Sequence, residues 1–412
     1  MTRAKRNRDR VIAFIASIVL ICLVYFFNNQ PFPFGGSTTF LTFFESLIQL
    51  RKSSHEPEDD TRVFVNVGYD ADLALTRHGK EKITDRQILT RFLKDLEGKN
   101  NYRQVFIDIR FEEGLNTEYD SLLVDQILNM RDVFVAKHWN PSEQAPEPLI
   151  DERLLNKSAY ADYATTIFNT AFSRYEFLQH KDTSVALKLY AALDKRSIRQ
   201  VGNGFFSLFF DGGRLCNNAS FIKIHDDYSS AERGTLSGKP KYYNLGEDIY
   251  GVFQYGSGTA FSKFMDDCDG KIIILGDFVF DMHDTYYKKQ PGPYLNYLGY
   301  QSLHKKEHFV SFWTGLIVFV LYYLTFIMIT RRFTLGTAIA ALRRRISKKP
   351  RRLLSGSLLV LELLAPLFEY PALLLLFSYI SVVFFDKGIS VFIPSVFFAL
   401  MDYCYKIARH EN

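Results

Sequence analysis

A group of acidic and imidazole side chains lies at or near the ends of the predicted strands: Asp70, Asp108, Asp277, Asp281, His283 and Asp284. Ligands of open parallel sheets bind outside the carboxyl ends of the strands, so these side chains could converge. Carboxylate oxygens with one imidazole suit a hard divalent cation or a polar ligand. We take Asp70, Asp108, Asp277 and Asp284 as the candidate ligand-binding set. In the structural alternative, Asp108 and Asp284 are buried acids bonded to backbone N–H groups, and the others are solvated.

A catalytic interpretation has weaker support. The sequence contains no phosphate-binding loop and no GxSxG, HExxH or CxxC motif. No pair of nucleophile and base is recognisable either. We therefore expect a non-enzymatic protein with no catalytic residue, no resident metal and no cofactor, and we keep divalent-dependent hydrolysis as a minor alternative.

The elements that would position these acids are predicted by apolar runs. Strands are expected at 63–68, 104–109, 133–136 and 271–276, and their continuous apolar character is typical of parallel strands covered on both faces. Between the first two strands, Thr84 is a candidate N-cap for a helix with one apolar face, formed by Ile88, Leu89, Phe92, Leu93 and Leu96. Further helices are expected at 119–128, with Leu122 on the apolar face, and from Thr183. The centre, 141–265, favours antiparallel strands and loops.

Two uninterrupted apolar segments predict transmembrane helices, at 11–27 and 309–330. A less regular apolar region follows, which we interpret as two more spans, 353–385 and 389–405. The predicted fold class is therefore α/β: a mainly parallel-core extracytoplasmic domain with a β-rich insertion, plus a bundle of about four transmembrane helices.

Basic residues flank the apolar segments and predict the topology. The head 1–10 and the linker 331–352 are strongly basic, although the net charge of the chain is only +5. The positive-inside rule therefore places both in the cytoplasm and 28–307 outside it, and the tail 406–412 returns to the cytoplasm. Because the basicity belongs to these flanks, nucleic-acid binding is not indicated. The cytoplasmic segments are too short to fold as an output domain, so any output would require a separate partner.

Several motifs together resemble the second type of CHASE domain, the cyclase/histidine-kinase-associated sensory extracellular family. These are the strand end Asn66-Val-Gly-Tyr-Asp70, a helix led by Asp85-Arg86, the strand with Asp108, a helix opened by Asp120, a lysine-led strand into Gly276, Asp284-Thr285, and Pro291-Gly292. The resemblance implies sensing by the outer domain, a bacterial source, one span before that domain and about three after it. Of the family's Pro-x-Pro-Arg-like lead only Arg86 is kept, and no kinase or cyclase follows before Asn412.

The functional expectation is a multi-pass protein of the bacterial cytoplasmic membrane. It would bind an unidentified signal outside the cytoplasm and relay it to a separate signalling or membrane protein. The alternative is a scaffold subunit of an envelope complex that senses nothing. We expect membrane lipid as a further partner of the basic linker, and a homodimer is compatible with either interpretation.

Two features remain open. Cys216 and Cys268 both lie outside the cytoplasm, where they could pair or stay as separate thiols. Glu362, Glu369 and Asp402 fall in or near the last apolar segments. Intramembrane acids often contact a partner helix or line an ion path, whereas an interfacial helix at 353–368 would leave both glutamates hydrated.

Overall fold

The computed structural model describes residues 3–29, 61–76, 79–111, 119–140, 142–161, 174–221, 241–251, 257–285, 289–331, 368–379 and 391–410, with a few single residues between 339 and 365. Most of the predicted linker 331–352, the first part of the predicted span 353–385 and the segment 380–390 lie outside the described residues.

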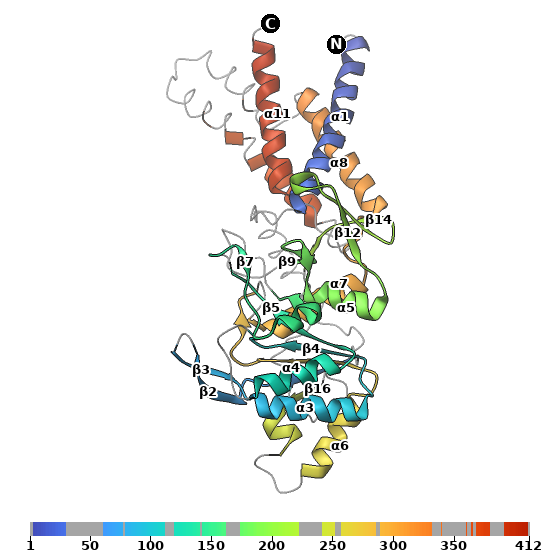
Figure 1. Cartoon of the computed structure of the whole chain (residues 1–412). Coiled ribbons are helices and arrows are strands. Elements are labelled where there is room, and N and C mark those ends of the chain that lie inside the picture. Colours follow the sequence, from blue (N-terminus) through green and yellow to red (C-terminus); the bar gives the residue numbers. More distant parts are fainter. Residues whose placement is uncertain are drawn as a thin grey trace.

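The centre of the large α/β domain is a six-stranded, wholly parallel sheet (Figure 1). Its strands, in spatial order, are β16 (Lys241–Asn244), β1 (Arg62–Asn66), β17 (Ile272–Gly276), β4 (Gln104–Asp108), β5 (Val133–Lys137) and β8 (Ser158–Tyr160). The four predicted strands are confirmed as β1, β4, β5 and β17. The sequence reasoning missed β8 and β16, because both are short and polar at several positions.

Helices cover both faces of this sheet. One face carries α3 (Arg86–Lys99), α4 (Asp120–Asn129) and α6 (Ser257–Asp267), while α5 (Val185–Asp194) and α7 (Gly292–His304) cover the other. Alternate residues of one strand supply the two cores, since Val63 and Val65 of β1 face the α3 layer and Phe64 faces the α7 layer. This two-sided burial explains the continuous apolar runs.

The helix starts differ from the predictions at two places. The N-cap of α3 is Asp85, not Thr84, because the Asp85 carboxylate accepts the N–H groups of Gln87 and Ile88 while Thr84 ends the hairpin strand β3 (Gly79–Thr84). The helix predicted from Thr183 is α5, which has Ser184 as its N-cap and begins at Val185. On α4, Leu122 is exposed rather than part of the apolar face, which Leu123, Val124 and Ile127 form.

The predicted β-rich region 141–265 is only partly a separate insertion. It contains the antiparallel sheet of β12 (Ile198–Val201), β13 (Leu208–Asp211) and β14 (Arg214–Cys216), and the pair β9 (Arg174–Glu176) and β15 (Ala219–Phe221). It also supplies two strands of the central fold, β8 and β16, the helix α5 and most of α6. The small antiparallel pairs are β2 (Ala71–Thr76) with β3, β6 (Trp139–Asn140) with β7 (Ala145–Pro146), β10 (Leu178–Gln179) with β11 (Asp182–Thr183), and β18 (Met282–His283) with β19 (Gln290–Pro291).

Two helices of the described part of the chain are long and apolar enough to cross a membrane. They lie within α1 (Arg3–Asn28) and α8 (Phe312–Arg331), and the two helices pack side by side (Figure 1). A third helix, α11 (Phe392–His410), packs on α8 through Phe398 against Tyr322 and Phe326, but its apolar part, Ile393–Tyr405, is shorter. The layer of α5 and α7 lies between the sheet and these helices.

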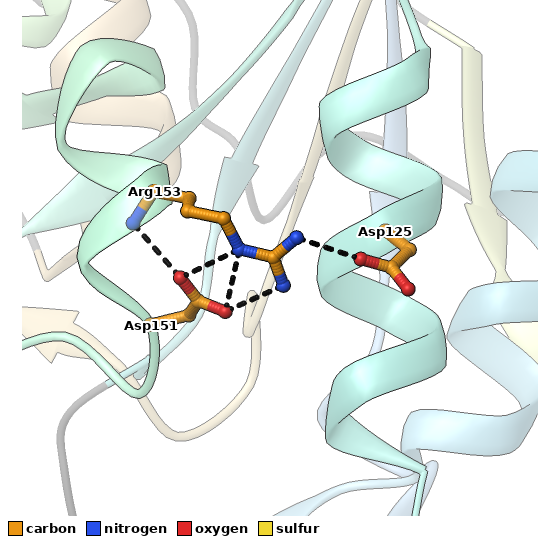
Figure 2. Close-up of polar contacts among 3 residues, drawn as sticks. All are labelled: Asp125, Asp151 and Arg153. Carbon is orange, nitrogen blue, oxygen red and sulfur yellow. Dashed lines mark hydrogen bonds and ion pairs between the residues drawn. The ribbon is translucent and has the colours of Figure 1, made fainter.

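A surface ion-pair group ties the α4 layer to the chain that leads to β8 (Figure 2). Arg153 donates to the Asp151 carboxylate at 2.7 Å and to Asp125 of α4 at 3.1 Å. These bonds hold the pKa of the Asp151 carboxyl below its usual range. Because Arg153 and Asp125 are more than half exposed, we assign this group a structural role away from the candidate site.

Candidate functional site

The candidate site lies at the carboxyl ends of β1, β17 and β4, where the strand order reverses. Strand β1 leads through the β2–β3 hairpin to α3 on one face of the sheet, whereas its neighbour β17 leads to α7 on the opposite face. Connections that leave adjacent strands toward opposite faces open a crevice, which is where ligands of such sheets bind. Gly276 ends β17 there, and a Cβ at this position would lie 2.4 Å from Pro293 of α7. The glycine thus allows α7 to begin close against the strand end.

Asn66 and Asp277 shape the loops of this edge. The Asn66 side-chain oxygen accepts the N–H groups of Gly68 and Phe278, both at 3.0 Å. The Asp277 carboxylate accepts the N–H groups of Val279 and Phe280 at 2.9 and 2.8 Å. Asp277 therefore has the backbone-bonded role that the structural alternative gave to Asp108 and Asp284.

Asp70 belongs to an acidic group on the β16 side of the edge. Its carboxylate accepts the Gly246 N–H at 3.1 Å. Partial burial raises the pKa of Asp70, the Gly246 bond opposes the rise, and the carboxylates of Asp85, Asp248 and Glu247 add to it. A cationic group placed here would relieve that repulsion.

Asp108 is the buried acid of the site. Only 8% of the residue is exposed, and Asn296 of α7 donates its amide to the Asp108 carboxylate at 2.9 Å. Burial and, to a smaller extent, the nearby Asp281 carboxylate raise the pKa of Asp108 to about 7, against the opposing effects of His138, the Asn296 hydrogen bond and His283. Asp108 is therefore buried, as in the structural alternative, but its partner is a side chain and not the backbone N–H groups that this alternative assigned to it.

Asp284 is not part of the buried group. Its side chain is 60% exposed and lies 3.8 Å from Lys289. The ionisable side chains that act on the pKa of Asp108 are instead Asp281, His138 and His283, and Asp281 contacts His283 at 2.9 Å. The structural alternative is therefore wrong for Asp284, because more than half of its side chain is exposed.

An exposed aromatic pair borders the same edge and was missed by the sequence reasoning. Tyr69 follows β1 and Phe280 follows β17, their exposed fractions are 59% and 70%, and their ring centroids lie 6.4 Å apart. Each ring follows a glycine at or just after the end of a strand, Gly276 or Gly68, and an aromatic residue in such a turn could have indicated an exposed ring. Such rings give a ligand a flat apolar surface beside the carboxylates.

A buried polar chain connects Asp108 to the far side of the domain. The Asn296 side-chain oxygen accepts the Tyr175 hydroxyl of β9 at 2.6 Å. The next residue, Arg174, donates to the backbone carbonyl of Asn28 at the end of α1. The candidate site and the first membrane helix are thus joined through α7 and β9.

Both candidate membrane helices, α1 and α8, are also bonded to one strand, β14. The Tyr25 hydroxyl of α1 donates to the Cys216 carbonyl at 2.9 Å. On the other side, Phe309 forms a bridge with Cys216, and Val310 donates to the Leu215 carbonyl at 3.3 Å. The predicted span 309–330 therefore starts too early, because the backbone groups of these residues pair with β14 and α8 begins at Phe312.

A fully buried acid stabilises this junction. Asp211 of β13 accepts the Tyr190 hydroxyl of α5 at 2.8 Å and the Arg196 guanidinium at 3.0 Å, and it lies 3.0 Å from the His308 imidazole. His308, only four residues before α8, is thereby connected to α5 and to β13. Such a fully bonded buried group holds its elements in one arrangement.

The remaining chemistry predicted from sequence is not assembled. Within the described ranges, no three His, Cys, Asp or Glu side chains converge as metal ligands. Cys216 and Cys268 form no disulfide and lie in the cores on opposite faces of the sheet. Asp402 is buried in α11 and Glu369 is half-buried, whereas Glu362 lies outside the described residues.

Comparison of the chain with protein-family models, with curated proteins and with solved structures found no match.

Proposed function

We propose that the chain is a sensor of the bacterial cytoplasmic membrane. Its outer domain would bind a signal molecule at the carboxyl edge of the sheet, through Asp70, Asp108 and Asp277 with Tyr69 and Phe280. The membrane helices would transmit the change to a separate signalling or membrane protein. The likeness of the motifs to the second type of CHASE domain agrees with this role.

The observation that carries the proposal is the continuous connection between the candidate site and the membrane. Asp108 lies at the start of the buried polar chain through Asn296 to Tyr175, and the neighbouring residue Arg174 bonds the end of α1 through an exposed hydrogen bond. Helix α7, which supplies Asn296, continues within a few residues to His308 and then to α8. A ligand that changes the position of Asn296 would therefore act on both membrane helices. The size of the shift would be set by the difference in the ligand's affinity for the domain with Asn296 in its present position and in the changed position.

We further propose that α11 is the last of about four spans and that both ends of the chain face the cytoplasm. The start of α1 and the end of α11 lie at the same end of the molecule, opposite the sheet (Figure 1). Protease added to sealed, right-side-out cells should leave tags at both ends intact and cut the outer domain. Cleavage of either tag from outside would contradict this topology.

The test of function is capture of the tagged full chain from mild detergent, followed by quantitative mass spectrometry. A sensor should hold a kinase, cyclase or regulator in stoichiometric amount. The activity of that partner should change with Asp108→Asn and stay unchanged with Asp284→Asn, a matched carboxylate outside the buried chain. If only envelope structural proteins are recovered, or if both variants leave the partner's activity unchanged, the sensor proposal fails and the scaffold alternative is favoured.

A further inference from the structure

An exposed apolar surface surrounds the ends of α1 and α8, on the β12–β14 sheet. We call it the juxtamembrane surface; its large exposed members are Val201, Phe206, Leu215, Val310, Phe312 and Trp313. Phe206 is 68% exposed, Phe312 76% and Trp313 69%. An apolar surface of this kind on a polar outer domain marks an interaction site.

The 202–206 loop of this surface lies level with the outer end of the first span. Phe206 contacts the ring of Phe26 at 5.3 Å, and Phe205 contacts Phe27 at 4.9 Å. Phe26 and Phe27 are the last apolar residues of α1, so they stand where the hydrocarbon core gives way to lipid headgroups. The loop continues the surface of the membrane helix rather than forming a separate patch.

The start of α8 brings further aromatic rings to this region. Phe312 and Trp313 form its first turn, with ring centroids 5.7 Å apart, and Val310 just before them pairs with Leu215 of β14. Amphipathic aromatic rings concentrate at the headgroup level of membranes. The sheet and both helices therefore present apolar and aromatic groups around one junction.

The exposed charges of the β12–β14 sheet are positive. A partner that carries both phosphate groups and apolar chains, as phospholipid does, fits these charges together with the apolar side chains. Within the sheet, from 198 to 216, the cations are Arg199 and Arg214 and the single acid is Asp211. Asp211 is fully buried and turned toward His308, while Arg199 and Arg214 are exposed. The solvent side of the sheet is thus cationic, which complements lipid phosphates.

We propose that the juxtamembrane surface inserts into the outer headgroup layer of the membrane that α1 and α8 cross, with phospholipid as its partner and Phe206 as its deepest residue outside the helices. The inference rests on the membrane spans of the proposed function. It adds a third contact between the outer domain and the membrane, beside the two helices α1 and α8. The strand β14, which bonds both helices, would then itself be held at the lipid surface.

The test uses the full chain in phosphatidylcholine vesicles whose acyl chains are brominated near the headgroup, because bromine quenches nearby tryptophan. Trp139 and Trp313 are the only tryptophans. A Trp139→Phe variant therefore reports on Trp313 alone. Phe206→Trp and the matched control Phe280→Trp, 70% exposed but outside the juxtamembrane surface, are made in a background with Trp139→Phe and Trp313→Phe.

The expected result is that Phe206→Trp loses emission by the same factor as Trp313, while Phe280→Trp keeps the emission that it has in unbrominated lipid. Val201→Trp should repeat the Phe206 result on β12. If Trp313 is quenched and both juxtamembrane variants are not, the lipid inference is wrong and the spans stand. If Trp313 also escapes quenching, the membrane placement of α8 itself fails.

Discussion

The titration of Asp108 makes the sharpest prediction. Its pKa is raised from 3.8 to about 7 in the folded chain, because the carboxyl is buried near Asp281. The folded state thus binds more protons than the unfolded state between these two values. The contribution of Asp108 to the free energy of unfolding is therefore greatest below the unfolded pKa and is lost as the pH rises through the folded pKa. At about 1.4 kcal/mol per pKa unit, the loss between about pH 4 and pH 8 approaches roughly 4 kcal/mol.

The Asp108→Asn substitution removes this term and keeps an oxygen that accepts the Asn296 amide. Below about pH 3 the variant and the parent should have similar free energies of unfolding, since the parent carboxyl is then neutral in both the folded and the unfolded state; at pH 5 the unfolded carboxyl is already ionised, and the variant should be more stable by about 1.5 kcal/mol. At pH 8 the variant should be more stable, by up to about 4 kcal/mol. The control Asp284→Asn alters an exposed carboxyl and should follow the parent at every pH.

The assay is urea unfolding of the full chain in detergent micelles, with labelling of the buried Cys268 thiol counted by mass spectrometry. The midpoint in urea, rather than the labelling rate, is compared at each pH, because thiol reactivity itself depends on pH. The reasoning is refuted if the midpoints of Asp108→Asn follow the parent's pH dependence. It is also refuted if the variant is destabilised equally at pH 5 and pH 8, which would indicate a purely geometric role.

Three further predictions concern the packing around the site. Tyr175→Phe removes the hydroxyl that donates to the buried amide on α7 at 2.6 Å, so it should lower the free energy of unfolding by about 1–3 kcal/mol in the same urea assay at pH 7. Gly276→Ala should lower the free energy of unfolding by about 1–3 kcal/mol, since the new Cβ would lie 2.9 Å from a backbone oxygen. The control Gly98→Ala, in α3, meets nothing within 4 Å and should raise the free energy of unfolding by roughly 0.5–1 kcal/mol. Equal effects of the two substitutions would contradict this reasoning. Non-reducing electrophoresis should show no bridge between Cys216 and Cys268, and a mobility shift that a reductant reverses would overturn the separation of the two cores.

Local pattern alone was sufficient for the main elements of the fold. The apolar runs of β1, β4, β5 and β17 and the face of α3 depend on neighbours in sequence, so they could be predicted as strands and a helix without the rest of the chain. The two long membrane helices were predictable for the same reason, because the length and composition of one segment decide whether it can span. These features also predicted that Asp70, Asp108 and Asp277 stand at strand ends.

Tertiary structure decided how these pieces are ordered and which side chains work together. Strands β16 and β8 joined the sheet only because strong neighbouring strands offered them backbone partners, since neither has an apolar run of its own. Whether an acid is buried depends on what packs over it: α7 brings Asn296 onto Asp108, while the Asp284 side chain stays mostly exposed. Residues 309 and 310 have the composition of a span, yet they pair with β14, a strand almost a hundred residues earlier. Contacts between segments so distant in sequence have no signature in either segment, because the free energy that selects them arises only when both are packed together.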